Sequence, residues 1–180
     1  MAHNEITAFQ KTTEILNTEN ENAVFVQFHG FAKNTKDPFV IMSNGTRETP
    51  FLDYISQLKT ELEFIDDSLT YKIAHIDTTW NRLVGFTNTQ GRYLNESIDP
   101  CSISAQNTSG KFIHLEQEKS RLRQDSTGWN KIKIALENIF NCDSILSSIK
   151  EKRSPIFYFY PNPVKGNEVF ILLYGFKLRS

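Results

Sequence analysis

The sequence contains little cysteine and no long apolar run. Its 180 residues include two cysteines, Cys101 and Cys142, without C-x-x-C spacing, which argues against a cysteine-based metal site. The sequence leaves open whether they form a disulfide or remain thiols, because spacing does not supply the geometry of a bridge. No segment approaches the ~18 apolar residues of a membrane-spanning helix, so we expect no membrane span.

Several functional signatures are also absent. The formal net charge is -1, from 20 basic and 21 acidic side chains, which gives no electrostatic reason to expect a nucleic-acid partner. The chain contains no glycine-rich nucleotide-binding motif, no G-x-S-x-G of a serine hydrolase and no H-x-x-E metal-binding pair. Its N-terminus lacks a basic region followed by an apolar one, so we expect no signal peptide in this chain.

The apolar residues that are present predict an α/β fold. Short continuous apolar runs are typical of strands buried on both faces, and apolar residues at helical spacing are typical of helices packed on one face. The predicted strands are residues 23–28, 39–42, 71–76 and 111–116, and the predicted helices are residues 5–17, 50–63 and 128–140. We place Trp129 on the apolar face of the last helix. Alternating strands and helices favour a mostly parallel sheet with helices on both faces.

The composition divides the chain near residue 150. Residues 1–150 form the predicted α/β domain, in which residues 78–95 have little regular pattern and are interpreted as a long functional loop or as a strand with a loop at its end. A charged linker at residues 151–154 precedes an aromatic run and a strand-like segment at residues 169–174. We therefore expect residues 151–180 to form a short β-rich tail.

The candidate catalytic residues follow two of the predicted strands. His29 and Glu116 each stand at the carboxyl end of a strand, where open parallel sheets bind their ligands. An imidazole there can bind zinc, and a nearby carboxylate can act as a general base. His114 lies two residues before Glu116, so both side chains are expected on one face of the strand. Two alternatives stay open: His29 is a hydrogen-bonded structural residue, and Glu116 pairs with Arg121 or Arg123.

Three further residues could recognise a substrate. Asn88 and Arg92 lie in the predicted functional loop, and Arg47 follows a tight turn. Arginine binds carboxylates through paired donors, so these residues could hold a substrate carboxylate. The alternative is that the two arginines are solvated loop residues.

Several segments together resemble the C-terminal half of a zinc-dependent amidohydrolase of the N-formylglutamate amidohydrolase and poly-γ-glutamate hydrolase type. The segments are Val26-Gln27-Phe28-His29-Gly30-Phe31, Ser43-Asn44-Gly45, Thr87-Asn88-Thr89-Gln90-Gly91-Arg92 and Phe112-Ile113-His114-Leu115-Glu116. The resemblance implies a zinc carboxypeptidase-like (phosphorylase/hydrolase-like) fold, with His29 as a zinc ligand and Glu116 as the base. The family's early His and Glu ligands have no counterpart here, so we expect either an N-terminally truncated chain or a degenerate zinc site.

The tail carries a second resemblance. Tyr160-Pro161-Asn162-Pro163 followed by an apolar strand resembles the opening of a type IX secretion C-terminal sorting domain, in a shortened form. This resemblance implies that the parent protein is secreted or displayed on the cell surface, with the type IX secretion machinery as a partner.

These observations lead to one functional hypothesis and two alternatives. The first is an exported metal-dependent hydrolase that cleaves an amide bond near a carboxylate in a small-molecule or peptide-like substrate. The second is an exported domain that retains the fold without catalysis, which the missing H-x-x-E pair suggests. The third, a carbohydrate-binding module, would use the many aromatic residues, and it ranks last because their spacing is typical of a core.

Overall fold

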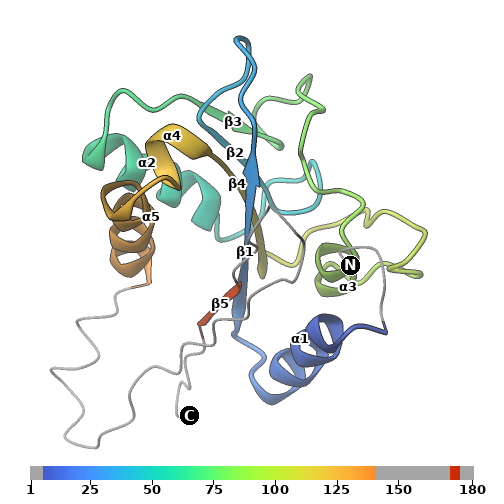
Figure 1. The fold of residues 1–180 in the computed structure, drawn as a ribbon. Coiled ribbons are helices and arrows are strands. Elements are labelled where there is room, and N and C mark those ends of the chain that lie inside the picture. The colour runs from blue at the N-terminus through green and yellow to red at the C-terminus, as the bar shows by residue number, and fades with distance from the viewer. Residues whose placement is uncertain (1–5, 141–170, 175–180) are drawn as a thin grey trace, which may run out of the picture.

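The computed structural model describes residues 6–140 and 171–174. Within these residues helices and strands alternate along much of the chain (Figure 1). The elements are α1 (Ala8–Glu19), β1 (Val24–Phe31), β2 (Val40–Ser43), α2 (Tyr54–Ile65), β3 (Tyr71–Ile73), α3 (Thr89–Leu94), β4 (Phe112–Glu118), α4 (Lys119–Leu122), α5 (Ser126–Ile139) and β5 (Ile171–Tyr174). The predicted α/β class is therefore confirmed.

The strands form one sheet in the order β3-β2-β4-β1-β5. Among β1 to β4, the pairs β1–β4 and β2–β3 are parallel, which confirms a mostly parallel arrangement for these four strands. The pair β2–β4 is antiparallel, and so is β1–β5. The direction changes because residues 32–39, which connect β1 to β2, contain no helix to return the chain to the starting end of the sheet.

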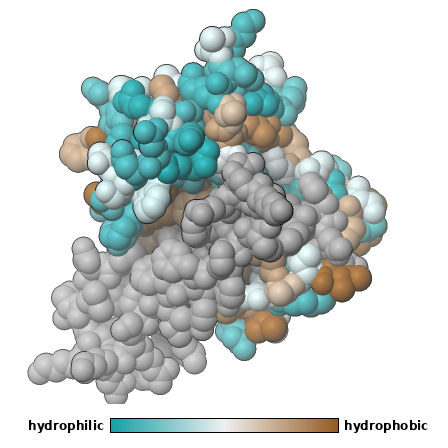
Figure 2. All heavy atoms as spheres, viewed as in Figure 1, coloured by the Kyte–Doolittle hydropathy of each residue, from teal (hydrophilic) through white to brown (hydrophobic). Residues whose placement is uncertain are grey.

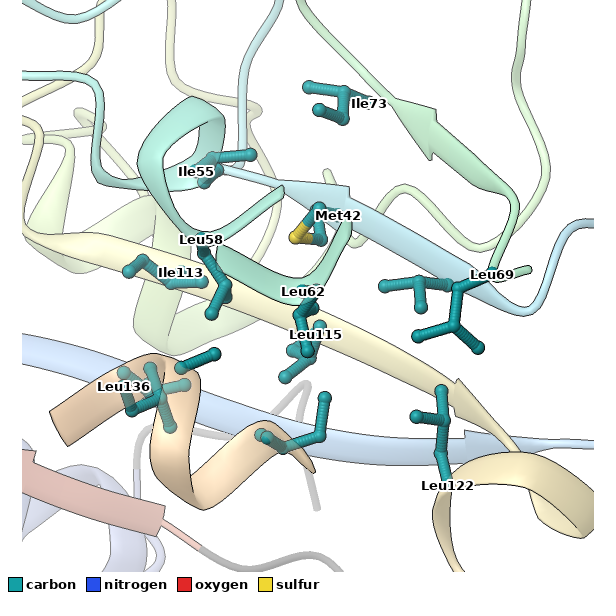
Figure 3. Close-up of a cluster of buried hydrophobic side chains, with 14 of the residues drawn as sticks. Met42, Ile55, Leu58, Leu62, Leu69, Ile73, Ile113, Leu115, Leu122 and Leu136 are labelled. Carbon is teal, nitrogen blue, oxygen red and sulfur yellow. The ribbon is translucent and has the colours of Figure 1, made fainter. Parts of the chain in front are cut away.

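Helices cover both faces of the sheet, as expected. Figure 1 shows α2, α4 and α5 on one side and α1 and α3 on the other. The side of α2 and α5 holds the larger apolar core. Its labelled members in Figure 3 are Met42, Ile55, Leu58, Leu62, Leu69, Ile73, Ile113, Leu115, Leu122 and Leu136, all buried. Burying these side chains is the main favourable contribution to the fold.

The opposite face has a smaller apolar cluster and a polar centre. Ala23, Phe25, Leu94 and Phe112 form the cluster at the end of the sheet near α1 and α3. Because side chains alternate along a strand, Gln27 and His29 face the same side as Phe25, while Val24 and Val26 face the larger core. The same alternation places His114 and Glu116 on the side of Phe112. The polar residues of the predicted site therefore share one face of the sheet.

Side-chain caps determine where several helices begin. The carboxylate of Asp53 accepts hydrogen bonds from the backbone N–H groups of Ile55 and Ser56 at the start of α2. Asn88 caps α3 in the same way, and Asp125 caps α5. Each cap satisfies backbone donors that have no partner within the helix.

The structure differs from the sequence-based expectations in local detail. β1 continues to Phe31 and β4 to Glu118, so His29 and Glu116 lie two residues inside their strands. The predicted loop at residues 78–95 contains the short helix α3. Trp129 is exposed at 59 %, and its indole N–H donates to the carbonyl of Arg123 at the surface, so its placement on the buried face of α5 was wrong.

Part of the predicted tail lies in the described residues. Ile171–Tyr174 forms β5, which pairs with Val24 to Gln27 of β1. The linker at residues 151–154, the Tyr160 to Pro163 motif and Cys142 lie outside the described residues. In the described part of the chain, none of the helices has the length and apolar character needed to cross a bilayer. Hydrophilic residues predominate on the upper part of the surface in Figure 2.

Candidate functional site

The register of β1 and β4 brings the candidate residues together. These two parallel strands are neighbours, with Gln27 opposite His114 and His29 opposite Glu116. All four side chains lie on the face of α1 and α3. Sequence positions more than eighty residues apart thus form a compact polar group at the centre of the sheet.

His29, His114 and Glu116 are in close contact, and we refer to them as the His-His-Glu cluster. The ring centroids of His29 and His114 are 4.5 Å apart, with the ring planes inclined by 39°. His114 Nε2 lies 3.5 Å from Glu116 Oε1. The side chains of His114 and Glu116 are 4 % and 8 % exposed, so the cluster is largely shielded from solvent.

Several polar atoms of the cluster are buried and unpaired. Among the described residues, His29 Nε2, both ring nitrogens of His114 and Glu116 Oε2 have no hydrogen-bond partner. An unpaired buried polar atom costs roughly 1–3 kcal/mol of stability, and such atoms are uncommon in folded proteins. A group of them in one place is typical of a site that binds a ligand.

Burial keeps His29 uncharged. Desolvation, with a smaller contribution from the charge of His114, lowers the pKa of His29 to about 3. Its imidazole is therefore neutral at neutral pH. Only a neutral imidazole has a nitrogen lone pair available for a metal ion.

Gly85 forms a wall of the cluster. Its φ angle is 67°, a conformation that favours glycine, and a Cβ atom at this position would lie 2.7 Å from Cγ of His114. The backbone at Gly85 thus packs directly against the His114 ring. A side chain there would displace His114 or the segment itself.

Gln27 and Asn88 join the cluster to α3. Asn88 Nδ2 donates a hydrogen bond to Gln27 Oε1, and Asn88 Oδ1 accepts from the backbone N–H groups of Gln90 and Gly91. Asn88, a predicted substrate-binding residue, therefore lies close to the site. Its donor and its acceptor are both engaged within the protein.

The two predicted substrate-binding arginines donate hydrogen bonds to loop carbonyls. The Arg47 guanidinium donates to the carbonyls of Ala74, Asp77 and Trp80. Arg92 donates to the carbonyls of Phe86, Pro100 and Cys101. Both arginines therefore have several acceptors within the protein, so they are not simply solvated loop residues, and their binding of a substrate stays a prediction.

The alternative interpretation of Glu116 can also be compared with the structure. Arg121 pairs with Asp66, and Arg123 donates through Nε to the carbonyl of Gln117. Neither contact involves Glu116. Among the described residues, Glu116 lies within ion-pair distance of His114, at 3.5 Å.

Sequence reasoning missed Gln27 and Gly85. The signal for Gln27 was its position two residues before His29, which places both side chains on one face of β1. Gly85 carried no local signal, because only the tertiary fold places it on His114.

The side chains of the cluster suit zinc chemically, but they do not form a complete site. Neutral imidazole nitrogen and carboxylate oxygen are zinc ligands. Within residues 6–140, however, no three His, Cys, Asp or Glu side chains are arranged to hold a metal ion. A comparison of the chain with models of known protein families, with curated proteins and with solved structures finds no match.

Proposed function

We propose that the chain is an exported metal-dependent hydrolase that cleaves amide bonds near a carboxylate. The observation that carries the proposal is the position of His29 beside Glu116 on adjacent parallel strands, with their side chains on one face. The imidazole of His114, the second one in the cluster, and the unpaired buried atoms of the cluster support the proposal further. The export of the protein rests on the resemblance of the tail to a type IX sorting domain.

Two residues of the cluster have distinct roles in this proposal, and His114 contacts both of them. His29 would hold zinc through a neutral imidazole. Zinc, when bound, would polarise the substrate carbonyl and lower the pKa of a water molecule. Glu116 Oε2 would accept the proton of the attacking water, because it is unpaired among the described residues.

Metal content and hydrolysis test the proposal together. We expect about one zinc per purified chain, lost in His29→Ala and retained in His75→Ala, since zinc binding needs its ligand. His75 is a suitable control because it is also buried and beside a carboxylate, Asp53 Oδ2 at 2.9 Å, outside the cluster. Elemental analysis of the folded variants measures this. A chain without zinc, or zinc retained in His29→Ala, would overturn the metal site.

Hydrolysis is measured with γ-glutamyl-p-nitroanilide and N-acetyl-L-glutamate as probes. Loss of a general base lowers kcat by about 10²- to 10⁴-fold, which we expect for Glu116→Gln. Glu118→Gln is the matched control, because glutamine can still accept the hydrogen bond that Glu118 receives from the Arg121 N–H at the start of α4. Equal activity of the two variants would contradict the role of Glu116.

A second candidate is an exported domain that keeps the fold without catalysis. The specific observation that favours it is the lack of three convergent metal-binding side chains within residues 6–140. This candidate predicts that Glu116→Gln changes no measurable property. Zinc-dependent hydrolysis that Glu116→Gln abolishes would exclude it.

A further inference from the structure

We infer that the side-chain NH₂ group of Gln27 binds the amide oxygen of the substrate, and that Asn88 holds Gln27 in the orientation for it. This inference rests on the proposed function, since it places the substrate amide at the His-His-Glu cluster. Gln27 would thus be a substrate-positioning residue, in addition to the roles proposed for His29 and Glu116.

The position of Gln27 is the first part of the evidence. Gln27 is buried at 3 % exposure, lies two residues before His29 on the same strand face, and stands opposite His114 in the β1–β4 register. A buried glutamine amide has two donors and one acceptor that require partners. Here the acceptor Oε1 is satisfied by Asn88. None of the described residues accepts a hydrogen bond from Gln27 Nε2.

The orientation of Gln27 is the second part. Asn88 Oδ1 caps α3 by accepting from two backbone N–H groups, so Asn88 Nδ2 must be the atom that faces Gln27. Because Nδ2 is a donor, the oxygen of Gln27 must face Asn88 and its NH₂ group must face the other way. The backbone of α3 thus determines, through two side chains, that the NH₂ group of Gln27 faces away from Asn88.

The chemistry indicates what this group recognises. An NH₂ group donates to oxygen and carries no charge, so it suits the neutral oxygen of an amide. Asn88, one of the three predicted substrate-binding residues, acts here through Gln27. Arg47 and Arg92 take no part in binding the amide oxygen or in orienting Gln27, because their guanidinium groups donate to backbone carbonyls elsewhere.

Side-chain NMR of the full chain tests the inference. The experiment uses the Glu116→Gln variant so that the probe N-acetyl-L-glutamate is not consumed. The Gln27 amide resonances are identified as the pair missing after Gln27→Glu. We expect them to shift when the probe is added and to stay in place with glutarate, which has carboxylates and no amide. Unmoved resonances with the amide probe, or an equal shift with glutarate, would overturn the inference.

A substitution at Asn88 separates its role in orienting Gln27 from its role in capping α3. Asn88→Asp keeps an oxygen acceptor for the α3 cap and removes the donor to Gln27, so Gln27 should turn its NH₂ group toward the new carboxylate. We expect about tenfold weaker probe binding, similar to Gln27→Ala, with helix content unchanged. Asn138→Asp is the matched control, because it removes the donor to Glu61 at the surface of α5. Unchanged affinity in Asn88→Asp would overturn the positioning role.

The two proposals fail in different ways. Hydrolysis by the unaltered chain with unmoved Gln27 resonances would reject this inference alone. Shifted resonances without any hydrolysis would reject the hydrolase and leave recognition of the amide oxygen by Gln27 in place.

Discussion

At the scale of single residues, one glycine and two arginines determine how the segment around Phe86 packs against the site. Arg92 Nε donates to the carbonyl of Phe86, and the Arg47 guanidinium lies over the Phe86 ring at 5.0 Å from its centroid. Phe86 follows Gly85, whose backbone packs on His114. The two arginines therefore hold the segment that covers the His-His-Glu cluster.

Substitution of Gly85 tests this packing. We expect Gly85→Ala to destabilise the fold and to lower probe hydrolysis, because its Cβ would lie 2.7 Å from the His114 ring. Gly110→Ala is a matched control: Gly110 also has a positive φ, 74°, but its nearest heavy atom to a Cβ is 3.6 Å away. Both variants have left-handed strain of roughly 1–2 kcal/mol. Urea denaturation and the two hydrolysis assays measure the difference between them.

Only the Gly85 variant should lose activity beyond its loss of stability. Equal activity per folded molecule in Gly85→Ala and Gly110→Ala would contradict the covering role of Gly85.

At the scale of elements, one aspartate joins three helices. Asp66 is the C-cap residue of α2, and it pairs with Lys131 of α5 at 2.7 Å and Arg121 of α4 at 3.2 Å. The Lys131 bond, helped by Ser68 and Arg121, holds the pKa of Asp66 well below its usual range. The Asp66 carboxylate is thus charged in the folded protein over the whole neutral and mildly acidic range.

This pKa shift predicts how stability depends on pH. A carboxyl whose pKa is lower in the folded state than in the unfolded state stabilises the fold above its unfolded pKa, near 3.9, and loses that effect as pH falls. We expect Asp66→Asn to cost about 1.5–3 kcal/mol at pH 7, the range for hydrogen bonds to charged groups. The difference from the unaltered protein should shrink below about pH 4.

Urea denaturation between pH 3 and pH 7 tests this prediction by measuring the free energy of unfolding of both proteins. The difference between them should follow the titration of the Asp66 carboxyl. Asp67→Asn is the control, because Asp67 is exposed and has no ion pair within the described residues. A constant difference at all pH values, or an equal effect of Asp67→Asn, would contradict the role of Asp66.

Prediction of the elements from sequence succeeded where periodicity was strong. The core of each long helix and of β1, β2 and β4 follows from apolar spacing. α3 was missed because it spans only Thr89–Leu94 and contains Gly91, whose missing side chain lets the helix lie against Phe112. A glycine inside a short helix lowers helix propensity, so this element depends on the Asn88 cap and on tertiary packing.

At the scale of the whole molecule, the two faces of the sheet differ in the polarity of the side chains that they bury. The face of α2 and α5 is an apolar core, whereas the face of α1 and α3 buries the unpaired polar atoms of the cluster. A fold optimised for stability alone would not bury such atoms, because each costs desolvation free energy. The second face is therefore the one expected to exchange stability for function.

Two neighbouring residues of β4 test this asymmetry. We expect His114→Leu to change the stability of the fold by less than about 1 kcal/mol, because it exchanges two ring nitrogens without hydrogen-bond partners for an apolar side chain and removes the 3.5 Å contact with Glu116. Leu115→Ala, one residue later and on the opposite face, should cost about 2–5 kcal/mol by leaving a cavity in the core. Urea denaturation measures both. A loss of stability in His114→Leu comparable to that in Leu115→Ala would contradict the asymmetry.

The sequence by itself determined the buried strands, the α/β class and the shared face of His114 and Glu116, because these depend on residues that are close along the chain. The tertiary structure alone decided that β4 lies beside β1, that β2 runs antiparallel to β4, and that Gln27 pairs with Asn88. It also decided that Arg47 and Arg92 bind backbone carbonyls. Strand order and side-chain partners arise from packing between distant segments, and local periodicity carries no information about which segments meet.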